Sequence, residues 1–402
     1  MTTPAGHIAF FCIPSSGHFN PTVPMVSELV RRGHRVSYAT TADFAPEVAA
    51  AGAEPVVCTS VLPSTQRGVP WPIGDTVAMS DLYLQEAIVS LPEQAAAFEA
   101  DRPDLIVYDC LSFTAQVLAR RWGIPSVRTL PTHEFGPDIW DEMEVLDLML
   151  EEEPGWHVYR RAFREFLDAA GIELGIDEFI YRGHADRYLV TIPREFQKDA
   201  DRIEDRFTFV GHCIDERRAG EQWERPADGR PLLLVSMGSA LRVDPDFYRL
   251  CVEAFGGSRW QVVLVVGGKA DPDAFGDVPP NFELHAFVPQ LSVLSQASAF
   301  VTHGGMGGTL EGLYHGVPMV VLPQVFDAFG NAALLERLGV AVSFTVDDLT
   351  AHQLRDAVES LVADQAVAGR LAELRTAMRA GGGPAAAADV IEECLRNVVA
   401  AQ

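Results

Sequence analysis

The sequence lacks the cysteine content and pattern of a small, disulfide-rich secreted protein. Cysteines are few, and no two of them form a C-x-x-C pair. Several lie in apolar runs, which is typical of reduced core residues, whereas disulfides belong to oxidising compartments. We therefore expect a cytoplasmic protein with free thiols at Cys12, Cys58, Cys110, Cys213, Cys251 and Cys394.

Basic residues are also scarce. The sequence has 31 Lys and Arg against 56 Asp and Glu, a formal net charge of −25. No basic stripe is visible, so we expect no nucleic-acid partner, and an anionic membrane surface would repel the chain. Surface charges are screened within about 8 Å at physiological salt. The acidic balance therefore does not exclude a diphosphate bound at contact distance.

Features of membrane and metal proteins are missing as well. No apolar run reaches the roughly 18 residues of a membrane-spanning helix, and the amino terminus lacks the pattern of a signal peptide. The histidines show no metal-ligand spacing such as H-x-x-x-H. We expect neither membrane insertion nor a bound metal.

The sequence does contain two similar patterns of alternating strands and helices. Its 402 residues suit two domains of about 200 residues each. The first pattern starts with the apolar run 7–14 and ends with a strand at 188–192, which we take as the last of that half. A stretch rich in turn residues follows, and the second pattern begins at 232. This predicts an α/β fold with parallel sheets, divided into domains at 1–208 and 231–380, a linker at 209–230 and a C-terminal helix at 381–402.

The stretch from 285 to 331 is the most informative. A predicted strand at 299–302 runs into His303 and four glycines, and a helix carrying Glu311 follows. A glycine-rich strand–helix turn presents backbone N–H groups and a positive helix end to an anion. Glu311 suits the hydroxyls of a ribose, and Phe287 offers a flat face to a base. A nucleotide site is therefore predicted, although the glycine turn taken alone also fits a simple tight connection.

Two further candidates follow predicted strands. His18 lies directly after the first strand, and Asp109 ends the strand DLIVYD. Ligand sites of open α/β sheets lie at the carboxyl ends of strands. A histidine that donates to an aspartate is a fixed and more basic imidazole, suited to take a proton from an alcohol. The alternative is that His18 caps the next helix or fills a polar loop.

The segment 131–154 interleaves aromatic and apolar residues with acids and predicts a pair of helices. With the loop at 61–76, it is expected to select the acceptor. His133 and Glu134, at its start, are candidate acceptor contacts, although a loop histidine is often only solvated. The acids of 138–153 favour an acceptor that carries an amine.

Taken together, the motifs resemble a known family. GHFNP, DLIVYD, LARRWGIP, VSMGSA, FVPQL, FVTHGGMGG and PMVVLPQ stand in the same order as in the bacterial family 1 glycosyltransferases of the macrolide, or oleandomycin, type. The resemblance covers nearly the whole chain. It implies a GT-B fold, in which two Rossmann-like domains with parallel sheets face an interdomain cleft and the last helix packs back on the N-terminal domain.

The resemblance also implies an activity. The N-terminal domain would bind a hydrophobic acceptor such as a macrolide, and the C-terminal domain a nucleotide sugar, typically UDP-glucose. The reaction would be inverting transfer to a hydroxyl, without metal or cofactor, with His18 as general base and Asp109 as its orienting partner. The implied donor-binding residues are Ser239, Phe287, Val288, Gln290, His303, Gly305, Gly308, Thr309, Glu311 and Asp327. The implied acceptor-binding residues are Ser15, Phe19, His133, Phe135 and Trp140.

One position departs from the family. Many relatives have Gln after the acid at the sugar end, whereas Ala328 follows Asp327 here. Loss of that amide leaves a sugar hydroxyl without a partner, at a cost of about 1–3 kcal/mol. A TDP- or UDP-deoxysugar in antibiotic biosynthesis is therefore the alternative donor.

Alternatives of other classes also remain. The same architecture serves nucleotide-sugar epimerases and hydrolases, and a non-catalytic sugar-nucleotide-binding homologue would keep the pocket. The chain is expected to be a monomer or a homodimer.

Overall fold

The computed structural model divides the chain into two compact units. The first comprises residues 1–214 and 381–402, and the second residues 215–380. The structure describes residues 5–63, 71, 72, 74–134, 145, 148–197, 199–214, 223–225, 229–238, 245–267, 277–324 and 326–401. Half of each predicted acceptor segment, 61–76 and 131–154, and half of the predicted linker at 209–230 lie outside these residues.

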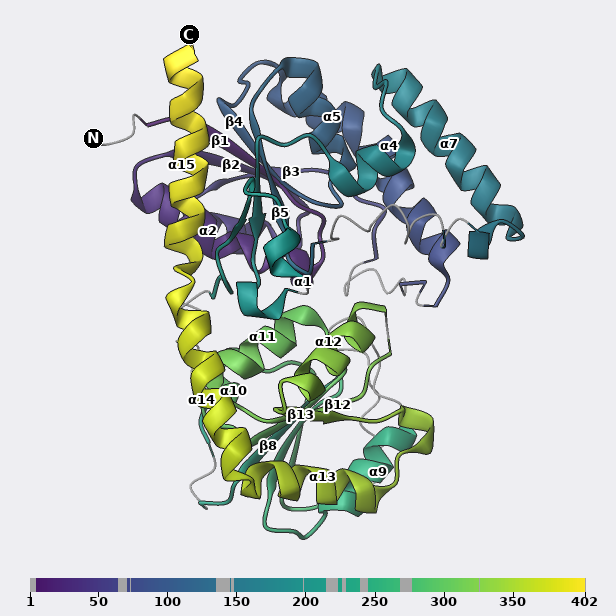
Figure 1. The fold of residues 1–402 in the computed structure, drawn as a ribbon, viewed down its shortest axis with the longest axis vertical. Coiled ribbons are helices and arrows are strands. Elements are labelled where there is room, and N and C mark those ends of the chain that lie inside the picture. Colours follow the sequence, from purple (N-terminus) through teal and green to yellow (C-terminus); the bar gives the residue numbers. More distant parts are fainter. Residues whose placement is uncertain are drawn as a thin grey trace. The chain divides into compact units, whose positions relative to one another are not determined.

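The first unit is built on a seven-stranded parallel sheet (Figure 1). Its strand order is β3-β2-β1-β4-β5-β6-β7. Apolar residues fill the central strands, as expected for a parallel sheet covered on both faces. The strands are β1 (His7–Phe11), β2 (Arg35–Thr40), β3 (Glu54–Val57), β4 (Leu105–Asp109), β5 (Ser126–Leu130), β6 (Arg187–Val190) and β7 (Phe207–Phe209). We predicted that the strand at 188–192 is the last strand of the first half. This was wrong, because β7 follows it and pairs with β6.

Helices cover this sheet. Their ends follow local chemistry: Asp75 caps α4 by accepting from the backbone of Ala78, and α5 and α7 end at Gly123 and Gly171 in the left-handed conformation that glycine favours. The helices are α1 (Ser16–Phe19), α2 (Thr22–Arg31), α3 (Ala45–Ala50), α4 (Thr76–Glu99), α5 (Phe113–Trp122), α7 (Pro154–Ala170), the π-helix η1 (Glu178–Arg182), the 3-10 turns η2 (Arg194–Phe196) and η3 (Ala200–Arg202), and α15 (Gly383–Ala401).

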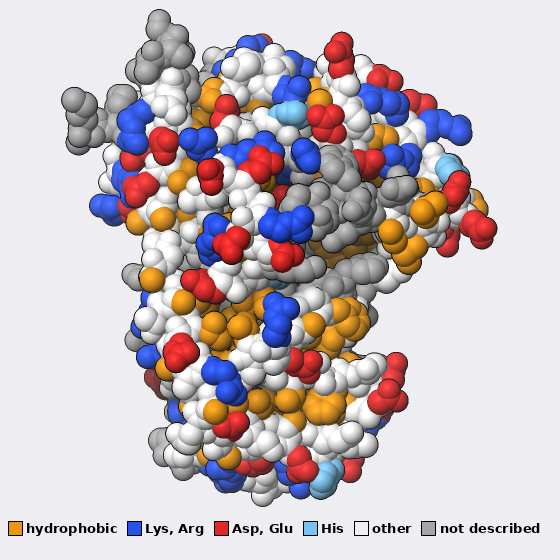
Figure 2. Space-filling view, in the orientation of Figure 1, with side chains coloured by type: hydrophobic (Ala, Val, Ile, Leu, Met, Phe, Trp, Pro, Cys, Tyr) orange, Lys and Arg blue, Asp and Glu red, His pale blue; other side chains and the backbone are white. Residues whose placement is uncertain are grey.

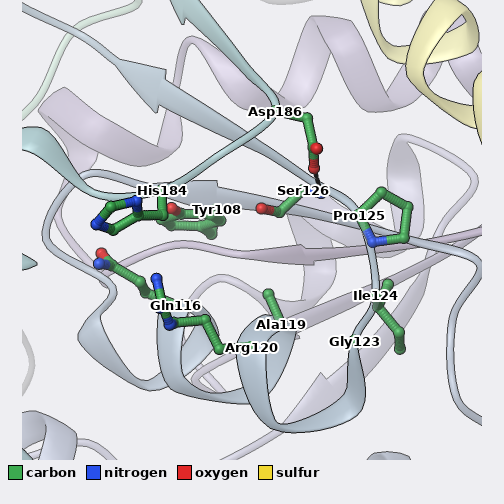
Figure 3. A pocket seen from close by; sticks show the side chains of 10 residues that line it. All are labelled: Tyr108, Gln116, Ala119, Arg120, Gly123, Ile124, Pro125, Ser126, His184 and Asp186. Atoms are coloured by element: carbon green, nitrogen blue, oxygen red, sulfur yellow. Dashed lines mark hydrogen bonds between the residues drawn. The ribbon is translucent and has the colours of Figure 1, made fainter. Parts of the chain in front are cut away.

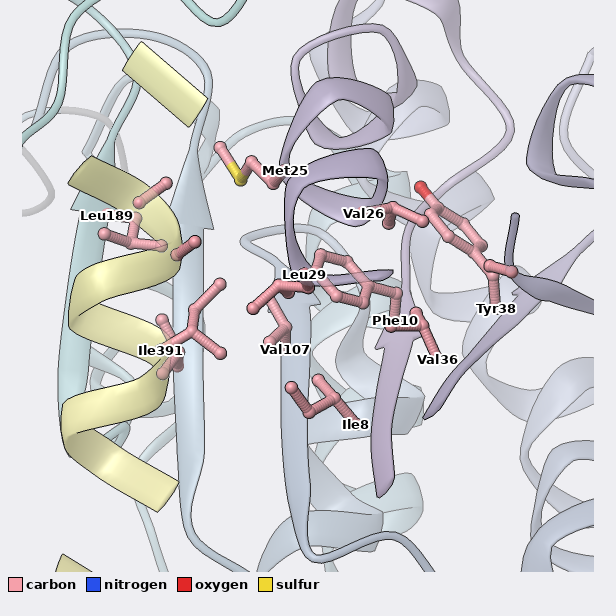
Figure 4. Close-up of a cluster of buried hydrophobic side chains, with 14 of the residues drawn as sticks. Ile8, Phe10, Met25, Val26, Leu29, Val36, Tyr38, Val107, Leu189 and Ile391 are labelled. Carbon is pink, nitrogen blue, oxygen red and sulfur yellow. The ribbon is translucent and has the colours of Figure 1, made fainter. Parts of the chain in front are cut away.

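The last helix, α15, is part of the first unit's core. Ile391 and Leu395 are buried in the cluster that also holds Ile8, Leu29 and Val107 (Figure 4). At the rim, Arg32 at the end of α2 pairs with Asp389 and Glu392. A segment far away in sequence therefore closes the core that begins with β1.

The second unit repeats the plan with a six-stranded parallel sheet. The strand order is β10-β9-β8-β11-β12-β13. The strands are β8 (Leu232–Ser236), β9 (Gln261–Val265), β10 (Phe282–His285), β11 (Ala299–Thr302), β12 (Met319–Val321) and β13 (Ala341–Ser343). The helices are α9 (Pro245–Phe255), α10 (Gln290–Leu294), α11 (Met306–His315), α12 (Phe326–Arg337), α13 (Ala351–Ala363) and α14 (Gln365–Ala380), with the 3-10 turn η5 (Val346–Asp348).

Both sheets reverse their strand order at one point, between β1 and β4 in the first unit and between β8 and β11 in the second. In open α/β sheets ligands bind outside the carboxyl ends of strands at such reversals. The predicted α/β fold of two parallel sheets is therefore confirmed, and each sheet has one topological switch point.

The surface agrees with the charge composition. On the face drawn in Figure 2, Lys and Arg side chains are scattered among acidic ones and do not form a continuous stripe. Among the described residues, no helix is both long and apolar enough to span a membrane.

Candidate active site

His18 and Asp109 meet at the switch point of the first unit. His18 lies on the short helix α1 that follows β1, and Asp109 is the last residue of the adjacent strand β4. His18 Nδ1 lies 2.7 Å from Asp109 Oδ2. The carboxylate is 1% exposed, whereas the imidazole is 21% exposed. Asp109 therefore holds one ring nitrogen while part of the ring remains accessible.

The surroundings of His18 make it more basic. Burial alone would lower the pKa of the imidazole, but the charge of Asp109, the hydrogen bond to Asp109 and a hydrogen bond with Cys110 together raise the pKa well above 6.5. The protonated ring is thus stabilised by a buried carboxylate, which is the arrangement that a general base needs as it takes up a proton.

Two residues that sequence reasoning missed support this strand end. The Cys110 thiol lies 4.0 Å from Asp109 Oδ2. Arg128, buried on β5, donates to the carbonyl oxygen of Cys110 at 3.0 Å and to that of Ile180 at 2.5 Å. The only sequence signal was the position of Cys110 directly after Asp109. Nothing in the sequence pairs Arg128 with the π-helix η1.

The predicted acceptor residues differ in their exposure. Ser15 is half-buried at the start of α1. Phe19 is 1% exposed and packs against Tyr38 and Phe44 in the core. Its side chain therefore belongs to the core in this structure, and its assignment as an acceptor contact stays a prediction. Phe135 and Trp140 lie outside the described residues.

His133 and Glu134 follow β5 and remain half-buried. The His133 ring stacks on Phe196 with centroids 5.8 Å apart. Gln197 exchanges two hydrogen bonds with the backbone of Glu134, each 2.9 Å long. Burial raises the pKa of the Glu134 carboxyl to about 7, although the charges of Arg128 and Arg206 oppose the shift. This carboxyl thus titrates near neutral pH.

The second unit places the glycine-rich turn at its own switch point. His303 and Gly304 follow β11, and Gly238 follows the adjacent strand β8. The His303 ring fills the space between two glycines: a Cβ at Gly238 would lie 2.4 Å from the ring, and one at Gly305 2.5 Å. Only glycine therefore fits at either position.

His303 is neutral in this setting. Burial lowers the pKa of its imidazole, while the carboxylate of Asp327 acts in the opposite direction. Its Nδ1 is buried and has no hydrogen-bond partner among the described residues. A neutral imidazole keeps one N–H, and this donor is suited to bond a phosphate oxygen.

The predicted nucleoside residues also cluster. Gln290, at the start of α10, donates to Glu311 on α11 at 2.6 Å. Gly308 faces the same amide, since a Cβ there would lie 3.7 Å from Gln290 Nε2. Phe287 is 70% exposed, so its ring is open, whereas Val288 is buried. The Val288 side chain thus packs inward, and only its backbone is available to a ligand.

Two residues at this site have buried side chains. Thr309 is fully buried, and its Oγ1 has no partner in the described part of the chain. It lies in the first turn of α11 with its side chain in the core, and its assignment to the diphosphate stays a prediction. Ala328 is fully buried and lies against Gly304. The expected role of position 328 in the choice of the donor sugar stays a prediction. Asp327, its neighbour, is exposed, and Ser239 lies outside the described residues.

A separate cavity of about 330 Å³ lies at the turn between α5 and β5 (Figure 3). Its lining includes Tyr108, Arg120 and His184, and Asp186 accepts from the backbone of Ser126 there. It holds none of the predicted site residues. It marks the amino end of β5, opposite to the strand ends that carry His18 and Asp109.

Comparison with known proteins decides the family. The chain is 43% identical to the oleandomycin glycosyltransferase of Streptomyces antibioticus over 98% of its own length and 91% of the relative's. The chain belongs to the oleandomycin-type glycosyltransferase family. It is also 35% identical to the NDP-glycosyltransferase YjiC of Bacillus licheniformis, over 97% of this chain and 98% of that one. Residues 253–394 match the model of the C-terminal domain of erythromycin biosynthesis protein CIII-like proteins.

Solved structures agree with this assignment. The crystal structure of the glycotransferase of kitacinnamycin superposes with a TM-score of 0.89 at 42% identity, covering 97% of this chain and 99% of that one. A calicheamicin glycosyltransferase superposes with a TM-score of 0.83 at 33% identity, covering 98% of each chain. This member of the oleandomycin-type family is therefore a glycosyltransferase of the GT-B fold, with a nucleotide-sugar donor and a small-molecule acceptor as its substrate classes.

Proposed function

We propose that this glycosyltransferase moves glucose from UDP-glucose to a hydroxyl of a hydrophobic natural product such as a macrolide, with inversion and without a metal or a cofactor. The observation that carries the proposal is the 2.7 Å contact between His18 Nδ1 and Asp109 Oδ2 at a switch point. The 43% identity to an oleandomycin glycosyltransferase supports a macrolide-like acceptor.

His18 is the general base. With Nδ1 held by Asp109, its other nitrogen, Nε2, carries the lone pair that takes the proton of the acceptor hydroxyl. The hydroxyl oxygen then forms a bond to the anomeric carbon as the bond to the diphosphate breaks. One displacement of this kind inverts the anomeric configuration. The buried carboxylate offsets the charge that forms on the imidazole.

The glycine turn of the second unit holds the leaving group. The N–H groups at the start of α11 and the imidazole of His303 favour a diphosphate, whose charge grows as the sugar leaves. Phe287 stacks on the base, Glu311 accepts from the ribose hydroxyls, and Gln290 fixes the Glu311 carboxylate. Asp327, exposed at the start of α12, accepts from hydroxyls of the sugar.

A turnover screen tests the proposal. UDP-glucose, UDP-galactose and a TDP-deoxysugar are paired with macrolides and flavonoids, without added metal, and products are detected by mass spectrometry. We expect a gain of one hexose with UDP-glucose that is lost in His18→Ala and strongly reduced in Asp109→Asn. Thermal unfolding of both variants checks that they fold.

The other outcomes distinguish the alternatives. Transfer only from the TDP-deoxysugar would overturn the choice of glucose and keep the mechanism. Full activity of His18→Ala would overturn the assignment of the base. Release of free glucose from UDP-glucose, unaffected by any acceptor, would support a hydrolase.

A further inference from the structure

Three chemically different side chains meet where β4 ends. The imidazole of His18, the carboxylate of Asp109 and the thiol of Cys110 each offer one potential metal-ligand atom, and these atoms lie within 4.8 Å of one another. In the described part of the chain, this is the one group of three His, Cys, Asp or Glu side chains with such spacing. Nitrogen, oxygen and sulfur donors together are typical of zinc sites and unlike the all-oxygen sites of Mg²⁺ and Ca²⁺.

We propose that His18, Asp109 and Cys110 form a binding site for Zn²⁺, and that the ion inhibits the enzyme by taking the place of the proton between His18 and Asp109. The binding site stands on the geometry alone, whereas the inhibition rests on the proposed role of His18 as base. The activity itself needs no metal.

The distances suit an ion of this kind. Tetrahedral zinc with bonds of about 2.0–2.3 Å separates neighbouring ligand atoms by roughly 3.3–3.7 Å. Nδ1 and Oδ2 are 2.7 Å apart, and Sγ and Oδ2 are 4.0 Å apart. The first pair has to separate by about 0.6–1.0 Å, and the second to approach by about 0.3–0.7 Å. Small rotations of the side chains provide such shifts.

The site is also accessible. The His18 side chain is 21% exposed, and Cys110 is only partly buried. An ion can therefore enter from the side on which the imidazole is open. The fourth position of the tetrahedron is left for water, as in zinc sites with three protein ligands.

Binding disables the base through its tautomer. The thiol of Cys110 releases its proton to solvent, and the carboxylate of Asp109 has none to lose. The ion bonds to His18 Nδ1, so the proton of the neutral ring moves to Nε2. An imidazole with a metal on Nδ1 and a proton on Nε2 has no free lone pair, so it cannot accept the proton of an alcohol.

Direct binding tests the site independently of activity. Co²⁺ replaces Zn²⁺ as a spectroscopic probe, because a thiolate ligand gives a charge-transfer band in the near ultraviolet. We expect one Zn²⁺ per chain by calorimetry and a thiolate band with Co²⁺. Cys110→Ala removes a direct ligand, so its affinity is expected to fall by at least the roughly 10- to 100-fold that loss of a partner behind a ligand costs. Cys58→Ala is the matched control, since Cys58 is a buried thiol of the same unit outside the cluster. Absence of the thiolate band in folded wild-type protein overturns the site.

Inhibition is then measured with each variant compared with its own metal-free rate. Zn²⁺ is expected to inhibit wild type and Cys58→Ala alike, and Cys110→Ala only at concentrations about tenfold higher or more. Equal inhibition of all three overturns the mechanism by placing the inhibitory ion elsewhere. Binding at Cys110 without any inhibition supports the zinc site but overturns the proposed inhibition. If no substrate pair gives turnover, the proposed function fails while the binding measurements still decide the zinc site.

Discussion

The side-chain amide of Asn331 donates to the carbonyl oxygen of Gly304 at 2.8 Å, and Asn331 is fully buried. Gly304 has a φ of +80°, and a Cβ there would meet Val321 at 2.6 Å. The glycine turn is therefore held from α12 in a conformation that other residues rarely adopt.

Replacing Asn331 tests whether this bond supports the nucleotide site. We expect Asn331→Ala to lower the free energy of unfolding by about 1–3 kcal/mol, because the Gly304 carbonyl loses a buried partner. The affinity for UDP, measured by calorimetry, falls as well. Asn331→Asp, which has the same shape but cannot donate from its carboxylate, is expected to be no better. Wild-type affinity in both variants would show that the turn keeps its conformation unaided.

Substitution of Phe287 tests directly how the nucleotide base is recognised. Its ring is 70% exposed, so Phe287→Ala is expected to leave the unfolding temperature almost unchanged. Its dissociation constant for UDP increases, because stacking of a base on an aromatic ring contributes about 1–3 kcal/mol. Phe287→Trp retains the affinity. Val278→Ala, an exposed apolar residue of the same unit, is the control. An equal loss in the control would point to a general effect on the unit.

The activity of the enzyme is expected to fall as pH decreases. The pH of half-maximal activity should lie above the value expected for an ordinary histidine. His18 must be neutral to act as base, and its pKa lies well above 6.5 because Asp109 and Cys110 outweigh the effect of burial. In a profile of kcat/KM against pH, activity appears only as pH rises through that pKa. Asp109→Asn removes the charge, so the remaining activity is expected to have its midpoint at lower pH. A midpoint that does not move would show that another group controls the profile.

The raised pKa of Glu134 predicts that the stability of the protein depends on pH. Burial raises the pKa of its carboxyl from 4.5 to about 7. Between pH 4.5 and pH 7 the folded state therefore keeps a proton that the unfolded state has lost. This group's stabilisation is present below pH 4.5 and is lost as pH rises through 7. Glu134→Gln is therefore expected to stabilise the protein at pH 8 more than at pH 5, by denaturant unfolding. Glu153→Gln, at an exposed position, is the control for the loss of one charge.

Arg128 is expected to be the costliest of these side chains to remove. It is 3% exposed and donates to carbonyl oxygens of Cys110, Ile180 and Tyr181. The last two belong to η1. Arg128→Leu removes these three hydrogen bonds, and a buried carbonyl that loses its partner costs about 1–3 kcal/mol. Thermal unfolding should show a large loss, with Arg187→Leu on the neighbouring strand as a mild control.

Much of this architecture could be predicted because parallel strands carry a strong signal. Runs such as residues 7–14 and 104–109 are apolar and end in polar residues, so both the strands and the edge that carries His18 and Asp109 follow from the sequence. β7 could not be predicted, because it has only three residues next to charged ones and lies at the sheet edge.

The burial of individual side chains was harder to predict from the sequence. Phe19, Thr309 and Ala328 lie in motifs that suggest ligand contact, yet all three face the core. Each lies on a helix next to a site, where a turn of about 100° per residue separates a ligand-facing position from a buried one. Residue type does not reveal which face is inward. Likewise, Gln290 and Glu311 were predicted as separate contacts, and only the packing of α10 on α11 shows that they bond to each other.

The position of α15 has a consequence for biosynthesis. Ile391 and Leu395 complete a core that β1 begins, and the whole second unit is translated between them. A chain emerging from the ribosome can therefore assemble the second unit from contiguous sequence, while the first must wait with an apolar face uncovered until α15 appears. We therefore expect the nascent first unit to be the part of the chain most exposed to aggregation before translation reaches α15.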